Sequence, residues 1–369
     1  MKKIIALLLA LTLCLLCGCG GGAKETEVPT TLAPATNATT EAPATEAATE
    51  APTEAPTEAP TEAPVVYTNP LTGEVLEEPF TNRVFAVTIN NLEAALPHRG
   101  VYQADLFMEM YVNHSIIRGL ALFTDIASVD SIGSVRSTRP IFTDIAGHYD
   151  AFVAHAGGSG QALTDQFNSG IDNMNVDTGN STDYSYRDKA RTGAYEHTLF
   201  AKGAGLKATV EGKGIRVTQD PDKNYGLTFT EDGTPSGGED ASSITISFLY
   251  AHVYKDTVMA YDADLGKYVY HQYGKMMTDA DTNEKEAFEN VIVMIGKDHL
   301  DGTGYHIFDF NGGGEGFFAC GGKIIPITWS CAGDDQPFTF TTMDGEPVNL
   351  GVGSTYIAIA PTGSKVAYE

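Results

Sequence analysis

Five arginines and two histidines gather within residues 118–197 of an otherwise acidic chain. They are Arg118, Arg136, Arg139, Arg187, Arg191, His155 and His197. A guanidinium group holds phosphate or carboxylate through paired, charge-assisted hydrogen bonds. The N–H groups at the start of a helix also attract anions, because the helix leaves them unpaired. These residue types therefore predict a binding site for an anionic ligand, provided that helix starts lie beside them.

The first such helix is expected to begin at Pro140. Proline suits the opening position of a helix because its missing N–H would have no partner there. Arg136, Ser137 and Arg139 immediately precede it, so their side chains would surround the helix start. The apolar residues that follow recur at helical spacing on one face: Ile141, Phe142, Ile145 and Tyr149.

A second strand-to-helix turn is expected shortly after the first. Residues 151–155 (AFVAH) have the composition of a short buried strand, and residues 161–167 that of the next helix. The turn between them, AGGSG, would let a ligand approach the backbone closely because it contains glycine. The turn residues included in the predicted site are Gly157, Gly158 and Ser159. AGGSG matches no Walker or dinucleotide-binding pattern, so it carries weight only together with the arginines.

Each of these features also has a structural explanation. The arginines could form ion pairs inside the domain with nearby carboxylates, namely Asp105, Glu109, Asp144 and Asp150. His155 and His197 have a pKa range suited to acid–base catalysis, yet a lone histidine at the end of a strand is more often a hydrogen-bonded structural residue. Asp105 and Glu109 could bind a divalent cation, but their spacing is equally typical of an exposed helix face. We assign no catalytic residue, no metal and no cofactor.

The first residues predict export and lipid attachment. Lys2 and Lys3 precede an apolar run, which is the layout of a secretory signal peptide over residues 1–18. The run ends in Leu-Cys-Gly-Cys, which resembles a bacterial lipobox with Cys19 as the thiol that receives diacylglycerol. A plain signal peptide rich in cysteine is the alternative. Anchoring by two or more acyl chains would hold the protein on the extracytoplasmic face of the cell membrane.

Residues 19–65 are expected to form the lipidated cysteine and a disordered tether behind it. They consist largely of Thr, Glu, Ala and Pro with a repeated TEAP, and such a composition cannot bury a core. The prolines and like charges favour an extended form. A tether of this length suits a Gram-positive envelope, in which the folded head must stand away from the membrane. The net charge of −25 argues against a nucleic-acid partner.

The remaining residues predict two folded segments of an α+β protein. Strand-like runs alternate with helical patterns over residues 66–214, which indicates a mixed α/β first domain. A connecting loop rich in glycine and charge is expected over residues 215–242. Short alternating strands then fill residues 243–362 and indicate a mostly antiparallel β domain, followed by a tail at 363–369.

One segment of the first domain is left open. Residues 105–112 (DLFMEMYV) carry apolar residues at positions that suit either a helix or a buried strand. Apolar periodicity alone does not distinguish the two in so short a run.

Two cysteines of the second domain, Cys320 and Cys331, are expected to stay unbridged. A hairpin turning on Gly321 and Gly322 would place Cys320 opposite Lys323. Cys331 would then lie too far along the strand for a disulfide bond.

Several long stretches resemble the YerB-like lipoproteins, a family that carries a domain of unknown function in two parts. They are NPLTGE at 69–74, VTINNLEAALPHRGVYQADLFMEM at 87–110, IGSVRSTRPIFTDIAGHYDAFVAHAGGSGQA at 132–162, EHTLF at 196–200 and GKIIPITW at 322–329. The resemblance spans residues 66–362 and implies a lipid-anchored extracytoplasmic protein with an α+β first domain and a β-rich second domain. It implies no reaction, because the family has no established one. The chain departs from the pattern at residues 113–115, where an acidic, glycine-rich turn is expected.

The sequence therefore predicts an envelope lipoprotein whose first domain binds an anionic cell-wall ligand or a protein partner through an arginine-lined cleft. One alternative is an envelope enzyme acting on phosphorylated polyprenyl-linked glycans, which rests on analogy at the level of fold. Another is an assembly scaffold without a ligand. Whether the arginines converge without carboxylate partners distinguishes these hypotheses.

Overall fold

The structure is a computed structural model that describes residues 65–178 and 182–369. The described residues cluster into one compact unit. The predicted signal peptide, the lipidation site at Cys19 and nearly all of the predicted tether lie outside the described residues. Within the part of the chain that is described, no helix is both long and apolar enough to cross a membrane.

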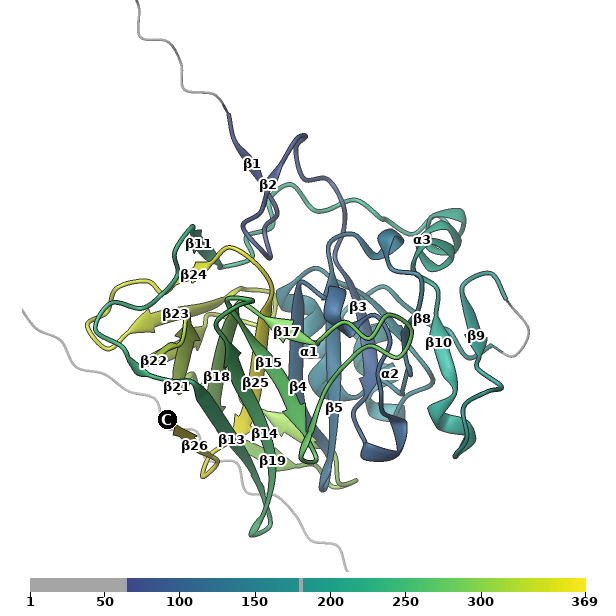
Figure 1. The fold of residues 1–369 in the computed structure, drawn as a ribbon. Helices are drawn as coiled ribbons and strands as arrows, with labels where there is room; N and C mark the ends of the chain where they lie inside the picture. Colours follow the sequence, from purple (N-terminus) through teal and green to yellow (C-terminus); the bar gives the residue numbers. More distant parts are fainter. Residues whose placement is uncertain (1–64, 179–181) are drawn as a thin grey trace, which may run out of the picture. The chain divides into compact units, whose positions relative to one another are not determined.

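A mixed sheet of eleven strands is the largest element of the fold (Figure 1). Its strands, in spatial order, are β12 (Glu239–Asp240), β22 (Lys323–Cys331), β21 (Gly314–Cys320), β18 (Asn290–Gly296), β25 (Thr355–Pro361), β4 (Leu106–Asn113), β5 (Ile116–Phe123), β3 (Phe85–Asn90), β7 (Phe152–His155) and β8 (Asn173–Asn175), and β23 (Phe338–Thr342) pairs with β22. At its centre, β25 pairs in parallel with both β18 and β4. The two sequence segments therefore contribute strands to one continuous sheet.

A second sheet of six strands is antiparallel throughout and packs on one face of the first. Its members are β16 (Lys275–Met276), β15 (Lys267–Gln272), β14 (Val253–Asp262), β13 (Ser243–Tyr250) and β26 (Lys365–Tyr368), with β17 (Ala287–Phe288) beside β15. Smaller sheets are formed by β6 (Ile132–Gly133), β10 (Leu199–Ala201) and β9 (Ser185–Arg187), by β1 (Tyr67–Thr68) and β2 (Val75–Leu76), by β11 (Thr228–Thr230) and β24 (Asn349–Gly351), and by β19 (Asp298–Leu300) and β20 (His306–Phe308).

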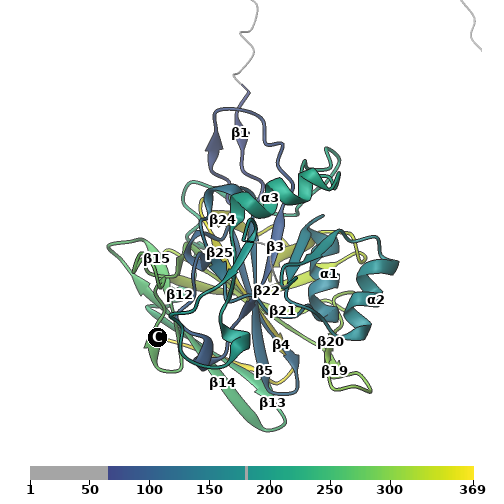
Figure 2. The same ribbon diagram turned by 90° about the vertical axis from the view of Figure 1, so that its right-hand side faces the viewer.

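The other face of the large sheet carries two of the three α-helices of the described residues. The α-helices of the described residues are α1 (Pro140–His148), α2 (Gly160–Asn168) and α3 (Gly203–Gly212), and short 3-10 helices lie at Glu93–Ala95, Val101–Gln103, Ile126–Ser128 and Tyr195–His197. Figure 2 shows α1 and α2 on the side of the large sheet opposite β14 and β15. The large sheet is thus the middle layer of three.

The side chains of β4 point alternately to the two faces of the large sheet, and both faces are buried. Phe107 and Tyr111 point into the core shared with the six-stranded sheet, where Phe107 packs on Phe288 and Tyr111 on Phe248. Met108 and Met110 point to the opposite core, which contains the apolar face of α1. Because successive side chains of a strand point to opposite faces, a strand that is apolar at nearly every position must be buried on both.

The predicted fold class, α+β with a mixed first part and a largely antiparallel second part, is confirmed. The open segment 105–112 forms the central strand β4, because packing on both faces outweighs any helical preference. Residues 215–242 contain β11 and β12, and residues 363–369 contain β26. Cys320 lies opposite Lys323 as predicted, and it and Cys331 are free thiols.

Candidate anion site

Strand β5 places Arg118 under the starts of the helices. The side chain is only 3% exposed and points to the helix-covered face of the large sheet. Its Nη1 donates a hydrogen bond to the backbone oxygen of Ser137, at 2.6 Å. This contact ties the strand to the segment that precedes α1.

The segment from Val135 to Arg139 is held on both sides by backbone hydrogen bonds. The N–H of Arg136 donates to the oxygen of Thr88 in β3, at 3.0 Å, and the N–H of Ala156 donates to the oxygen of Arg136, at 2.8 Å. The N–H of Thr138 donates to the oxygen of Gly157, at 2.9 Å. The two turns that the sequence predicted are therefore neighbours, and the helix starts lie side by side.

Both helices begin as their residue types predict. Pro140 occupies the first turn of α1, and Arg139 precedes it without a capping hydrogen bond from its side chain. At α2, the hydroxyl of Ser159 accepts a hydrogen bond from the N–H of Ala162, at 3.2 Å. The start of α2 is therefore capped by the chain itself, while the start of α1 has guanidinium groups beside it.

Arg118, Arg136 and Arg139 form a group of mutually repelling cations. Burial, together with the charges of Arg139 and Arg136, lowers the pKa of Arg118 to about 8. Burial also lowers the pKa of Arg136 and of Arg139. Among the described residues no carboxylate forms an ion pair with any of the three, and the buried Nε atoms of Arg136 and Arg139 have no hydrogen-bond partner there. Glu196 acts electrostatically on Arg136 in the direction that favours its charged form, but none of the three guanidinium groups has a directly paired carboxylate in the described residues.

Tyr305, at the loop before β20, completes this group from the other sequence segment. The guanidinium of Arg139 lies over its ring, 4.8 Å from the centroid. The tyrosine also acts electrostatically on Arg118 and Arg139 in the direction that favours their charged forms. Sequence analysis missed Tyr305, since nothing local indicates that residues so far apart in the chain meet.

His155, Gly157 and Gly158 lie beside the group, but their polar atoms are largely engaged. Nδ1 of His155 lies 2.8 Å from the oxygen of Gly157, and Nε2 lies 3.1 Å from Oδ1 of Asn173. Burial lowers the pKa of His155, so its neutral form is favoured. The N–H of Gly157 donates to Oδ1 of Asn175, at 3.1 Å. His155 is therefore explained as a hydrogen-bonded structural residue. Gly158 lies beside Thr138, where the two turns form a β-bridge.

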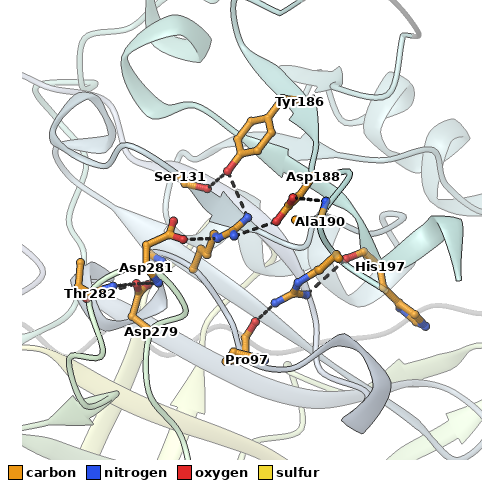
Figure 3. Close-up of polar contacts among 12 residues, drawn as sticks. Pro97, Ser131, Tyr186, Asp188, Ala190, His197, Asp279, Asp281 and Thr282 are labelled. Carbon is orange, nitrogen blue, oxygen red and sulfur yellow. Dashed lines mark hydrogen bonds and ion pairs between the residues drawn. The ribbon is translucent and has the colours of Figure 1, made fainter. Parts of the chain in front are cut away.

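Arg187 and Arg191 do not join the group, because each has partners of its own. Arg187 pairs with Asp177 at 2.6 Å and lies 3.5 Å above the ring centroid of Tyr195. Arg191 donates to the backbone oxygens of Pro97 and His197 (Figure 3).

The same figure shows Asp188 and Asp281 on the guanidinium of the neighbouring Arg99, each at 2.8 Å. Arg99 and Arg191 both lie over the ring of Phe200. This part of the predicted site is a structural ion-pair network.

His197 connects the two regions. Nδ2 of Asn90 donates a hydrogen bond to Nδ1 of His197, at 2.8 Å. Burial lowers the pKa of His197. Arg136 and Arg191 act on it electrostatically in the same direction. His197 therefore borders the arginine group as a neutral side chain.

The carboxylates that the sequence offered as ion-pair partners for the arginines do not contact the three arginines of the site. Asp150 pairs with Arg83 and Arg216, and Glu109 pairs with Lys255 on the opposite face of the sheet. Asp105 accepts from Thr124 and Asn69. Asp144 lies in α1, where burial raises its pKa to about 7. No group of three or more metal-binding side chains occurs in the described ranges.

Four surface cavities of the described residues lie away from the arginine group. They measure about 400, 490, 430 and 610 Å³, and none is lined by Arg118, Arg136 or Arg139. The largest of the four is lined by Asp144, Asp309 and Asp334 among others, and its acidic lining is unsuited to an anion. The arginine group is thus a partly exposed surface site between helix starts rather than one of these cavities.

The described residues thus form an α+β protein in which three arginines without a directly paired carboxylate meet beside two helix starts. The chain belongs to the DUF3048 family, a family of proteins of unknown function. Its N-terminal domain model matches residues 71–216 and its C-terminal domain model matches residues 244–357. The resemblance noted from the sequence is confirmed.

Two comparisons involve one bacterial relative. The chain is 27% identical, over 295 residues, to the YerB protein of Bacillus subtilis (strain 168), which carries a provisional lipoprotein name; the match covers 79% of this chain and 86% of that protein. The crystal structure of YerB matches with a TM-score of 0.70 at 23% identity, covering 81% of this chain and 99% of that one. The likeness to the crystal structure shows that the fold is shared.

Proposed function

We propose that this chain is a lipoprotein anchored through Cys19 on the extracytoplasmic face of the membrane, and that its head binds an anionic ligand through Arg118, Arg136 and Arg139. The lipobox-like sequence at the cysteine and the lipoprotein name of the relative support the anchor. The ligand would be an anionic component of the cell wall or an acidic segment of a partner protein.

The observation that carries the binding proposal is the missing counter-charge. A buried or half-buried charge is costly unless a partner of opposite sign accompanies it. The described residues provide salt bridges to Arg83, Arg99, Arg187 and Arg216, yet none to the three arginines of the site. A bound anion would supply the missing charge and relieve the repulsion among the three.

The surroundings favour a multiply charged anion over a single carboxylate. One carboxylate carries a single negative charge and cannot balance three guanidinium groups. The planar guanidinium group also matches the spacing of phosphate oxygens. The start of α1 adds the positive end of the helix dipole. Phosphate and pyrophosphate are therefore the simplest test ligands, with phosphorylated wall fragments next.

Thermal unfolding of the full-length protein with increasing phosphate, pyrophosphate or wall fragments tests this proposal. A ligand that binds only the folded state stabilises it by about 2.7 kcal/mol at a concentration one hundred times its Kd. We expect the midpoint to rise with pyrophosphate concentration in the wild type and to stay constant in an Arg136→Ala variant.

An Arg216→Ala variant is the matched control, because it removes a guanidinium that pairs with Asp150, at 2.5 Å, outside the site. It should lose some stability yet respond to pyrophosphate as the wild type does. Equal responses of the Arg136→Ala variant and the wild type would remove the named site.

A further inference from the structure

A second group of buried polar residues lies on the opposite face of the large sheet, between the two sheets. Its centre is Glu109 in β4, which is 0% exposed. The carboxylate accepts hydrogen bonds from Lys255 in β14 and from Nδ2 of Asn91, at 2.7 Å, both through Oε1. Its Oε2 accepts from Thr257 at 2.7 Å and from Tyr356 at 2.6 Å. An amine and a carboxamide are thus bound to one carboxylate oxygen inside the protein.

The amine and the carboxamide are close to each other. Nδ2 of Asn91 lies 2.7 Å from Oε1, and the contact of Lys255 with the same atom is shorter, so the two nitrogens are separated by less than twice 2.7 Å. Asn91 directly follows β3 of the large sheet, whereas Lys255 belongs to the six-stranded sheet. The pair therefore faces across the interface between the two sheets.

The orientation of the carboxamide follows from its partners. A carboxylate only accepts hydrogen bonds, so the group of Asn91 that faces Glu109 must be the NH₂ group. Its oxygen, Oδ1, accepts a hydrogen bond from Nε2 of Gln272, at 2.5 Å. A donor on this oxygen polarises the carbonyl and would stabilise negative charge that develops there during attack by a nucleophile.

The surroundings exclude water and favour neutral partners. Asn91, Tyr270 and Tyr356 are 0% exposed, the side chain of Lys255 is 14% exposed, and the rings of Tyr270 and Tyr356 lie 5.6 Å apart at the centre of the site. In such a place a lysine and a glutamate can exchange a proton and become neutral, because charges are costly there. Burial lowers the pKa of Lys255, the direction that yields a nucleophilic amine.

We propose that Lys255 and Asn91 form an intramolecular amide bond between Nζ and Cγ, with Glu109 as the residue that carries the proton. The bond would join the two sheets covalently. It is independent of the anion site, which lies on the other face of the large sheet.

The reaction balances without an oxidant or another reagent. The ammonium of Lys255 gives a proton to Glu109, and the neutral amine attacks Cγ of Asn91 while charge accumulates on Oδ1. The remaining excess proton of Nζ and the proton on Glu109 pass to the departing nitrogen. The Cγ–Nδ2 bond breaks, one ammonium ion leaves, and Glu109 returns to its carboxylate form. The product is an amide that is lighter than the starting chain by one ammonia molecule.

Peptide mapping of the full-length protein tests this proposal directly. Trypsin cleaves after Lys and Arg, so an unlinked chain yields the separate peptides 84–99, 224–255 and 256–267. A linked chain resists cleavage after Lys255 and yields peptide 84–99 joined to 224–267, at the summed mass minus ammonia. We expect the linked species to replace nearly all of free peptide 84–99, with fragmentation that places the link on Asn91.

Variants define the chemistry. Lys255→Ala and Asn91→Ala should restore free peptide 84–99, and Glu109→Gln should do the same because it removes the proton carrier. Lys285→Ala is the matched control, because Lys285 forms its ion pair with Asp262, at 2.7 Å, and takes no part in the reaction. This variant should retain the linked species. If the variants fail to fold, the wild-type map still decides. Full recovery of the separate peptides from the wild type, or a link at another residue, would overturn the proposal.

Discussion

Arg118 is a charged side chain in a place that suits an apolar one. It is almost fully buried, and among the described residues its guanidinium donates a hydrogen bond to the backbone oxygen of Ser137. Its positive neighbours make the charged form still less favourable. A bound anion would offset the cost of this buried charge, which is why Arg118 belongs to the proposed site.

An Arg118→Met variant should separate binding from stability. Methionine keeps the length of the apolar stem and removes the charge. Replacing buried charges by apolar groups is often neutral or stabilises by about 1–4 kcal/mol. We therefore expect an unchanged or higher unfolding midpoint without ligand, and no further rise with pyrophosphate. A midpoint that falls steeply would instead assign Arg118 a structural role.

Asp144 in α1 should make the protein less stable as pH rises. Burial, with the charges of Asp334 and Asp165, raises its pKa from 3.8 to about 7. Between these values Asp144 is ionised in the unfolded chain but still protonated in the folded chain. Its contribution to the free energy of unfolding is therefore complete below about pH 4 and is lost as the pH rises to about 7. The shift corresponds to at most about 4 kcal/mol.

An Asp144→Asn variant removes this titration. Urea unfolding should show a larger gain over the wild type at about pH 8 than at about pH 4. The exposed Asp222→Asn serves as the control and should show no such difference. A gain of equal size at both pH values would mean that Asp144 is not the titrating group.

At the scale of elements, local signals predicted the two helices and the turn between them. Pro140 and Ser159 act within their own turns, and such capping depends little on the rest of the fold. The arginines were a different case. Arg187 pairs with Asp177 ten residues away, but whether Arg136 has a partner depends on which distant segments meet, and Tyr305 reaches the site from the other sequence segment. Composition and spacing do not contain that information.

The start of α2 gives a test at this scale. Ser159→Ala removes the cap on Ala162 and should cost about 1 kcal/mol in the free energy of unfolding. Because the arginines belong to other elements, the variant should keep the pyrophosphate response. Loss of that response with only a small loss of stability would move the site from α1 to the start of α2.

For the whole molecule, the shared sheet predicts one cooperative unit. The two segments that the family models recognise meet where β25 pairs with β4, in the middle of the large sheet. Neither segment completes the sheet alone. The sequence predicted the strands, but not this exchange between segments, since strand order is a long-range property.

Ile357→Ala at this junction should destabilise both segments together. Ile357 is 0% exposed and lies between Ile292 and Met108 in the neighbouring strands. A buried isoleucine replaced by alanine costs about 2–5 kcal/mol. Calorimetry should show one transition at a lower temperature, whereas the exposed Val253→Ala should change little. Two separate transitions, with only one shifted, would show that the segments unfold independently.

We propose that Arg118, Arg136 and Arg139, none of which has a directly paired carboxylate in the described residues, bind an anion. Isothermal titration of pyrophosphate into the full-length protein measures this most directly. We expect saturable binding of one ligand per chain by the wild type and by Arg216→Ala, and none by Arg136→Ala. Identical titration curves for the wild type and Arg136→Ala, or no heat of binding with the wild type, would contradict it.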